Sequence, residues 1–279
     1  MAFQEKITKL GNKVFGSKAS EKLGRFVTRN EIIGFLIGLI WGRNLTKLAI
    51  IYNTDKWGDH FYTPHYQHHL KKFKYKRMNV LEIGVGGYDS PHKGGNSLRM
   101  WKRYFPFAKI FSLDIYDKSP QEERRIKIFR GSQVDHDFLD KVVNETGEFD
   151  IIIDDGSHIN EHVIESFKYL FPKLKNGGVY VAEDTQTSYW EDYGGDSEDL
   201  KNEKTMLNYF KQLTDTLNHV ELLRKDYEPS YFDKHIVSMH FYHNMVFIHK
   251  GDNNEQSSKV IKNEKLKVKE SKASLADNA

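Results

Sequence analysis

Short apolar runs alternate with amphipathic segments through the middle of the chain, between about residues 51 and 250. The run at 149–153 is largely apolar, which is typical of a strand buried on both faces of a parallel sheet. The last two runs flank His243 and Asn244, and a connection this short predicts an antiparallel hairpin. The seven expected strands are 78–83, 110–113, 126–129, 149–153, 179–182, 236–242 and 245–249.

Helices are expected between these strands. Val163, Phe167 and Leu170 recur at helical spacing, and Asp135 is suited to cap the helix that follows it. The expected helices are 97–104, 135–144, 161–170 and 201–217. This alternation predicts an α/β fold, a mostly parallel, Rossmann-like sheet of seven strands with an antiparallel hairpin at its edge.

Two regions of different composition flank this domain of residues 51–250. Residues 1–50 are first basic and then apolar, and we expect a helical N-terminal extension there. Residues 251–279 contain a lysine-rich run with few large apolar side chains, which predicts a disordered tail.

The apolar stretch at 32–41 raises the question of a membrane contact. Ten helical residues rise about 15 Å, whereas the bilayer core is about 30 Å thick, so this stretch cannot span it. We expect a helix of the core or of a subunit interface. The alternative is a peripheral anchor on the inner face of the membrane, because Lys13, Lys18, Lys22, Arg25 and Arg29 precede the stretch.

Composition removes several classes of function. The net charge of the 279 residues is only +3, so bulk charge does not predict a nucleic-acid binder. The chain has no cysteine, which excludes disulfide scaffolds, thiolate zinc sites and cysteine nucleophiles. The absence of cysteine fits a cytoplasmic enzyme.

A glycine-rich turn, residues 81–87, follows the first expected strand. Gly84 permits a tight turn and a close approach of the backbone to a ligand. The dinucleotide-binding pattern is incomplete, because no third glycine follows at the required spacing. Glu82 suits an ammonium group better than a pyrophosphate, and S-adenosylmethionine carries an α-amino group and a sulfonium cation. We therefore expect this cofactor.

The ends of the next two strands supply further candidate cofactor residues. Asp114 ends the second strand, where an acidic residue can accept hydrogen bonds from both ribose hydroxyls. Ser132 and Gln133 follow the third strand, where a small polar loop can meet an adenine edge. The alternatives are a helix cap at Asp114 and a plain loop at 131–133.

Acidic pairs end the fourth and fifth strands, at Asp154-Asp155 and at Glu183-Asp184. Adjacent parallel strands deliver their carboxyl ends to one edge, so Asp155, Glu183 and Asp184 are expected to converge. Three carboxylates repel one another unless a cation neutralises them. Oxygen ligands favour Mg²⁺, with Mn²⁺ or Ca²⁺ as alternatives. The competing interpretation is that these residues cap two separate helices.

His158 lies three residues after Asp155, on the turn that leaves the same strand. An imidazole that titrates near neutral pH can take a proton from a hydroxyl group, and a metal ion would lower the pKa of that hydroxyl. We expect His158 to be the general base. Other histidines, such as His60, His65, His68 and His69, are expected to be surface or packing residues.

Five motifs together resemble one known family, the macrolide deoxysugar O-methyltransferases of the mycinamicin and demethylmacrocin type. No single motif would be specific, but the similarity runs from about residue 52 to residue 250. The motifs are Asp55-Lys56-Trp57-Gly58 with His60, Tyr62, Thr63 and Pro64, then 81–88, 95–101, 154–158 and 183–190.

The resemblance implies a class I methyltransferase fold that binds S-adenosylmethionine and Mg²⁺, with a segment around Tyr62 closing over the site. It implies a sugar hydroxyl as the acceptor, a second hydroxyl bound to the metal, and a homo-oligomer. A deoxysugar of a natural product, a cell-surface glycan and a lipid-linked sugar remain open as acceptors. The implied residues are Asp155, Glu183 and Asp184 for the metal, His158 as base, Glu82, Gly84 and Asp114 for the cofactor, and Ser132, Gln133 and Asp154 near the adenosine.

Two other functions remain as alternatives. A catechol-type O-methyltransferase would use the same metal on an aromatic diol, but a lysine base is usual there and this chain has His158. A catalytically silent binding module would dock membranes through residues 1–50.

Overall fold

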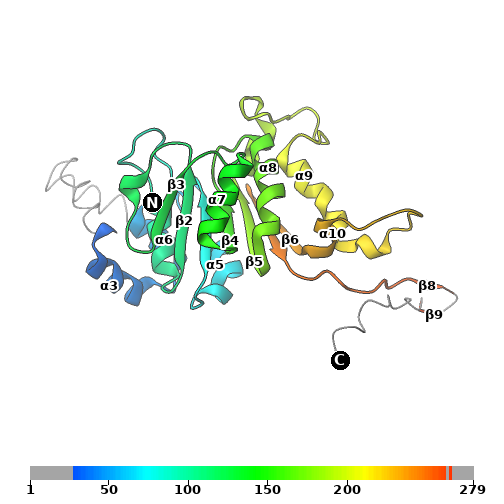
Figure 1. Cartoon of the computed structure of the whole chain (residues 1–279), viewed down its shortest axis with the longest axis horizontal. Helices are drawn as coiled ribbons and strands as arrows, with labels where there is room; N and C mark the ends of the chain where they lie inside the picture. Colours follow the sequence, from blue (N-terminus) through cyan, green and yellow to red (C-terminus); the bar gives the residue numbers. More distant parts are fainter. Residues whose placement is uncertain (1–27, 262–263, 266–279) are drawn as a thin grey trace.

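A seven-stranded sheet forms the centre of the molecule (Figure 1). The computed structural model of the chain describes residues 28–261 and 264–265. The strand order is β3-β2-β1-β4-β5-β7-β6, with β1 to β5 parallel and β7 antiparallel to both of its neighbours. The predicted α/β fold with an antiparallel edge hairpin is therefore confirmed. The strands are β1 (Asn79–Ile83), β2 (Lys109–Asp114), β3 (Ile126–Arg130), β4 (Phe149–Asp154), β5 (Leu174–Glu183), β6 (Ile236–Tyr242) and β7 (Met245–Lys250).

Helices cover both faces of the sheet because alternate strand residues point to opposite sides. Val80 and Ile151 pack under α4 (Leu45–Tyr52), α5 (Thr63–Leu70) and α6 (Asn96–Tyr104). Leu81 and Ile152 pack under α7 (His136–Thr146), α8 (Asn160–Leu170) and α9 (Met206–Gln212). Figure 1 shows α7 and α8 lying across the near face. The result is a three-layer arrangement with an apolar core on each side of the sheet.

The described part of the N-terminal extension packs against α6. Asn30 caps α3 (Glu31–Trp41) by accepting from two backbone N–H groups. Glu31 forms ion pairs with Lys102 and Arg103 of α6. Residues 1–27 of the predicted extension lie outside the described residues. None of the described helices combines the length and the apolar character that crossing a membrane requires.

The predicted helix over 201–217 is wrong at its start. The side chain of Asp196 accepts from the backbone N–H groups of Glu198 and Asp199 and from the Asn202 amide, which holds the preceding chain in turns. The α-helix α9 begins only at Met206 and continues after Gln212 as a 3₁₀ helix. Asp135 does cap α7, since its side chain accepts from Phe138 N at 3.1 Å.

The remaining elements are short. Asn253, in the segment predicted as a tail, donates to the backbone oxygens of Thr216 and Asp233. The division of the chain into three regions stays a prediction. The short elements are η1 (Lys71–Phe73), η2 (Ser119–Gln121), η3 (Phe171–Lys173), η4 (Thr185–Tyr189), η5 (Glu191–Tyr193), η6 (Leu213–Glu221), α10 (Tyr231–His235), β8 (Val260–Ile261) and β9 (Glu264–Lys265).

The glycine-rich turn requires glycine at Gly84 for two reasons. Its φ is +94°, in the left-handed region, and a Cβ added there would lie 2.2 Å from the backbone oxygen of Asp155. The Gly84 N–H also donates to Leu113 O at 2.8 Å. The turn after β1 is thus packed directly against the ends of β2 and β4.

We expect Gly84→Ala to lower the free energy of unfolding by about 3 kcal/mol, because it adds a backbone clash to left-handed strain. Gly86→Ala is the matched control: its φ is +76°, but no atom lies within 4 Å of an added Cβ. Left-handed strain alone predicts a loss of about 1 kcal/mol there. Chemical denaturation of both variants measures the difference, and equal losses would contradict the close approach.

Candidate active site

A cavity of about 800 Å³ opens at the carboxyl ends of β1, β2 and β4. The strand order reverses between β1 and β4, which is where open α/β sheets bind ligands. Its lining includes residues 83–88 in and after the glycine-rich turn, residues 113–116 at the end of β2, residues 131–133 after β3 and residues 155–158 after β4.

Four of the predicted cofactor residues line this cavity: Gly84, Asp114, Ser132 and Gln133. Asp114 is fixed by its own surroundings, since one carboxylate oxygen accepts from Val85 N at 3.0 Å and the other from Tyr116 N at 2.9 Å. A carboxylate offers about four lone-pair sites, so both oxygens retain acceptor capacity for a ligand.

Glu82 and Asp154 are placed differently, because both are buried behind the cavity wall and neither lines it. Glu82 Oε2 accepts from Ser97 Oγ at 2.9 Å. Asp154 accepts from Tyr180 OH at 2.9 Å and from the Gln133 amide at 3.2 Å. Burial raises the pKa of both carboxyl groups. In this structure these two residues position their neighbours rather than present an oxygen to the cavity.

A buried lysine occupies the centre of the acidic cluster. Lys56 Nζ lies 2.6 Å from Glu183 Oε1, 2.8 Å from Asp155 Oδ2 and 3.2 Å from Glu82 Oε1. Burial alone would lower the pKa of Lys56, but the three carboxylates outweigh it and hold that pKa well above its usual value. The three carboxylates therefore favour the protonated form of Lys56.

One ammonium group does not balance three carboxyl groups. Burial, followed by the nearby Asp155 carboxylate, holds the pKa of Glu183 well above its usual value. Burial likewise raises the pKa of Asp155. With one ammonium group among three carboxyl groups, the cluster has an excess of acidic groups over cations.

A second cluster shares Asp155 with the first. Ligand atoms of Asp155, His158 and Asp184 lie within 4.8 Å of one another. His158 Nε2 is 3.7 Å from Asp184 Oδ2, and His60 Nε2 is 3.6 Å from Asp184 Oδ1. Burial would raise the pKa of Asp184, but the hydroxyl of Tyr62 at 2.7 Å and the two imidazoles outweigh it and lower that pKa.

The backbone of the second cluster is strained. His158 has a φ of +56° and Asp184 a φ of +54°, both in the left-handed region that non-glycine residues rarely adopt. Such residues collect at functional sites, where the surrounding structure holds them in place.

These residues fit a divalent cation. Asp155, Glu183 and Asp184 come from the ends of adjacent strands, and their oxygens are the ligands that Mg²⁺ prefers. They do not form one group here, because Glu183 lies in the first cluster and Asp184 in the second, with Asp155 shared between them. The deficit of positive charge around Lys56 is the kind that a bound cation removes. Glu183 is the most enclosed of the three, because the hydroxyl of Tyr66 and Lys56 Nζ both donate to its Oε1.

Three residues of this site were not predicted from the sequence: Lys56, His60 and Tyr66. Lys56 and His60 stand in the motif around Asp55 that carries the family resemblance, and that motif was the one signal pointing to them. Lys56 is 99 residues from Asp155, so no local pattern connects the two. His60, expected to be a surface or packing residue, instead approaches Asp184.

We expect Lys56→Met to lower the free energy of unfolding by about 4 kcal/mol, because it leaves buried carboxyl groups without their cation. The pKa of these carboxyl groups is higher in the folded than in the unfolded state. The folded state therefore binds more protons and becomes more stable as the pH falls. The loss should therefore be smaller at pH 5.5 than at pH 8. Urea titrations at the two pH values measure it.

Lys118→Met is the control for that variant. Lys118 is equally buried, but its Nζ donates to Ser90 O at 2.9 Å and forms no ion pair within the described residues. It should lose about 1 kcal/mol at either pH. The same loss and the same pH response in both variants would refute the charge balance described for Lys56.

Comparison with known proteins places these features in a family. No family model matches the chain. It is 49% identical over 214 residues to demethylmacrocin O-methyltransferase of Streptomyces fradiae, covering 76% of this chain and 54% of that protein. It is 47% identical over 214 residues to mycinamicin VI 2''-O-methyltransferase of Micromonospora griseorubida, with the same two coverages. The chain thus spans about half the length of the curated relatives it matches.

Solved structures agree with these relatives. The MycE methyltransferase from the mycinamycin biosynthetic pathway, in complex with Mg and SAH, aligns with a TM-score of 0.74 at 42% identity, covering 83% of this chain and 64% of that chain. The MycE complex that also holds mycinamycin VI aligns with a TM-score of 0.73 at 40% identity, covering 91% of this chain and 63% of that chain. Over its matched part, the chain has the class I methyltransferase fold and belongs to the family of macrolide deoxysugar O-methyltransferases.

Proposed function

We propose that this chain is an S-adenosylmethionine- and Mg²⁺-dependent O-methyltransferase that acts on a sugar hydroxyl. The observation that carries the proposal is the cluster of Asp155, His158 and Asp184 at the cavity formed by the glycine-rich turn. It joins a candidate base and candidate metal ligands to a candidate cofactor site. The MycE structures with Mg and SAH support the same pair of ligands.

The two ligands have separate places in the proposal. When bound, Mg²⁺ supplies a Lewis acid for the acceptor hydroxyl and S-adenosylmethionine supplies the methyl group. Asp155, Glu183 and Asp184 would hold the metal. Gly84, Asp114, Ser132 and Gln133 would contact the cofactor, while Glu82 and Asp154 would hold the wall of its cavity in place.

His158 is the general base of the proposed reaction. Its Nε2 would take the proton from the sugar hydroxyl while the oxygen–methyl bond forms and the sulfur–methyl bond of the donor breaks, with S-adenosylhomocysteine as the leaving group. The Asp184 carboxylate, 3.7 Å away, stabilises the imidazolium that results. The neighbouring Tyr62 and His60 fix Asp184, so the base and its partner are oriented before the acceptor arrives.

The base distinguishes a sugar enzyme from the catechol-type alternative. That type usually has a lysine at the position of His158. Lys56 is the lysine that reaches these carboxylates, and its pKa is raised well above its usual value. It stays protonated and cannot accept a proton from an aromatic diol. A silent binding module is disfavoured because Asp155 and His158 line the cavity, and Asp184 lies in the same cluster of ligand atoms.

We expect His158→Ala to lower kcat by a factor of about 10² to 10⁴, because a positioned general base contributes that much. Binding of S-adenosylmethionine should be unchanged. The control is His136→Ala, since His136 lies on the surface and is hydrogen-bonded to Glu165. Methyl transfer from labelled cofactor to macrolide deoxysugars, nucleotide sugars, glycolipids and catechol measures the effect.

Two results of that assay would refute the proposal. Full activity of the His158→Ala variant would show that His158 is not the general base. A wild-type enzyme that methylates catechol and none of the sugars would favour the aromatic acceptor instead.

We expect Mg²⁺ affinity to fall as pH decreases from 8 to 6. Burial raises the pKa of Asp155 and Glu183, so protons compete with the metal for these oxygens nearer to neutral pH than for ordinary carboxyl groups. Calorimetric Mg²⁺ titrations at both pH values test this.

EDTA should abolish methyl transfer and Mg²⁺ should restore it; activity that survives EDTA would contradict the metal site.

Three other parts of the proposal rest on the sequence. A homo-oligomer, a cytoplasmic location and a peripheral membrane contact through residues 1–50 stay predictions. The acceptor sugar also stays open among a natural-product deoxysugar, a glycan and a lipid-linked sugar.

A further inference from the structure

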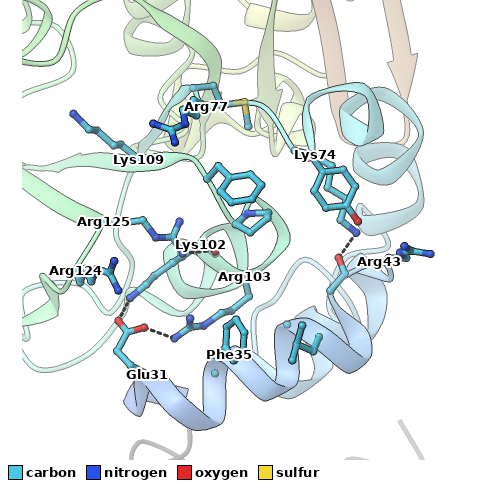
Figure 2. A pocket seen from close by; sticks show the side chains of 18 of the residues that line it. Glu31, Phe35, Arg43, Lys74, Arg77, Lys102, Arg103, Lys109, Arg124 and Arg125 are labelled. Carbon is cyan, nitrogen blue, oxygen red and sulfur yellow. Dashed lines mark hydrogen bonds and ion pairs between the residues drawn. The ribbon is translucent and has the colours of Figure 1, made fainter.

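A second and larger cavity, of about 1170 Å³, lies at the opposite edge of the sheet (Figure 2). Asn79, Lys109 and Lys175, which line it, stand at or near the amino-terminal ends of β1, β2 and β5. The helix α3 forms its other wall through residues 31–39. No residue of this lining belongs to the candidate active site, which opens at the carboxyl ends of the strands.

The lining of this basic cavity is strongly unbalanced in charge. Nine lysine and arginine residues contribute to it, against one acidic residue, Glu31. The whole chain has a net charge of only +3, so positive charge is concentrated here. The basic residues are Arg43, Lys74, Arg77, Lys102, Arg103, Lys109, Arg124, Arg125 and Lys175.

Protein carboxylates neutralise only part of this charge. Glu31 pairs with Lys102 and Arg103, Glu123 lies 2.9 Å from Lys102, and Asp150 lies 2.9 Å from Lys175. Arg77, Lys109 and Arg124 are exposed, and their side chains make no hydrogen bond or ion pair with any described residue. Three flexible cations therefore face the cavity without a partner in the described structure.

Neighbouring basic groups of the cavity also repel one another. Burial, followed by the charge of Arg103, lowers the pKa of Arg125, and Arg124 acts in the same direction. The Arg125 guanidinium is held in this unfavourable place by the backbone oxygens of Lys102, Phe105 and Ala108. An anion in the cavity would relieve the repulsion.

The helix beside this cavity carries an exposed apolar face. Gly34 lies inward, where an added Cβ would meet the Arg103 guanidinium at 2.3 Å, so the helix packs closely through its small residues. Ile37 packs into the core, whereas five other large residues of the helix are exposed. Ile32 is 74% exposed, Phe35 61% and Leu39 67%, and Leu36 and Ile40 are exposed beside them. Phe35 and Leu39 also line the cavity.

Charge decides among the partners that could cover this surface. Residues 1–27 carry six lysine and arginine residues against two glutamates, so this segment would add positive charge to a basic cavity. A second copy of the chain, related by a twofold axis, would bring one basic cavity against another. An anionic lipid bilayer presents both an apolar layer and phosphate groups, which match the two halves of the surface.

We propose that α3 and the basic cavity together form a docking site for an anionic membrane surface. The exposed face of α3 enters the acyl boundary, and Arg77, Lys109 and Arg124 bind lipid phosphates. This assignment is independent of the proposed methyl transfer, because the two sites share no residue.

The charge half of this site can be tested in the full-length chain. Arg77→Gln, Lys109→Gln and Arg124→Gln are combined in one variant. Partitioning onto vesicles of phosphatidylcholine with phosphatidylglycerol should fall by about a hundredfold, because each basic residue at such a surface contributes about fivefold. High salt should weaken wild-type binding, and pure phosphatidylcholine vesicles should bind little.

A matched control separates this site from bulk charge and from residues 1–27. Lys141→Gln, Lys204→Gln and Lys225→Gln remove the same charge at exposed positions outside the cavity. This variant should bind vesicles within about threefold of wild type. Equal losses in both triple variants would overturn the proposal, and so would no loss in either.

The apolar half has its own pair of variants. Phe35→Ser with Leu39→Ser should reduce vesicle binding at least tenfold without changing the melting temperature, since both side chains are exposed. Leu200→Ser with Leu223→Ser changes two other exposed leucines and should have no effect. Inorganic pyrophosphate serves as a soluble test ligand for the same basic residues. Saturable pyrophosphate binding without vesicle binding would overturn the lipid assignment in favour of a free phosphorylated ligand.

Discussion

The ion cluster of Lys56 with Glu82, Asp155 and Glu183 is the interaction on which the candidate active site depends. It joins the segment before α5 to the ends of three strands, β1, β4 and β5. Removing charges from water is costly, so such a cluster persists only where the charges satisfy one another. Here one ammonium group faces three carboxyl groups, and the remaining negative charge suits a further cation. The structural role of Lys56 and the proposed metal site are thus two parts of the same charge balance.

That balance also assigns different tasks to neighbouring groups. Lys56 is enclosed by carboxylates and stays protonated, so it stabilises the site but cannot act as a base. His158 lies at the edge of the cluster, near Asp184 and facing the cavity, where it can exchange a proton with a ligand. The left-handed backbone at His158 and at Asp184 keeps these two side chains in this arrangement. The strain is located where the proposed reaction needs precise orientation.

Local patterns predicted what depends on neighbours in sequence. The alternation of apolar residues located all seven strands, and the positions of Gly84 and Asp114 at strand ends placed both at the cavity. The patterns could not show in which direction a side chain points, or which residues far apart in sequence come into contact. Glu82 stands in the turn motif, yet its side chain is buried towards Ser97 and Lys56. Lys56 lies 127 residues from Glu183, and a contact that distant leaves no local trace. The wrong start of α9 has a similar cause, since side-chain bonds of Asp196 outweigh helical propensity there.

The two cavities give the molecule a polarity that its small net charge conceals. Carboxylates gather at the carboxyl edge of the sheet and basic residues at its amino edge. The six residues of β2 span about 20 Å between the two edges. With the amino edge docked on a bilayer, the candidate active site would face the aqueous side at about that height. A sugar on a short lipid in the same bilayer would not reach it. Docking at α3 therefore favours an acceptor that arrives from water, such as the sugar of a soluble natural product, over a sugar held close to the membrane.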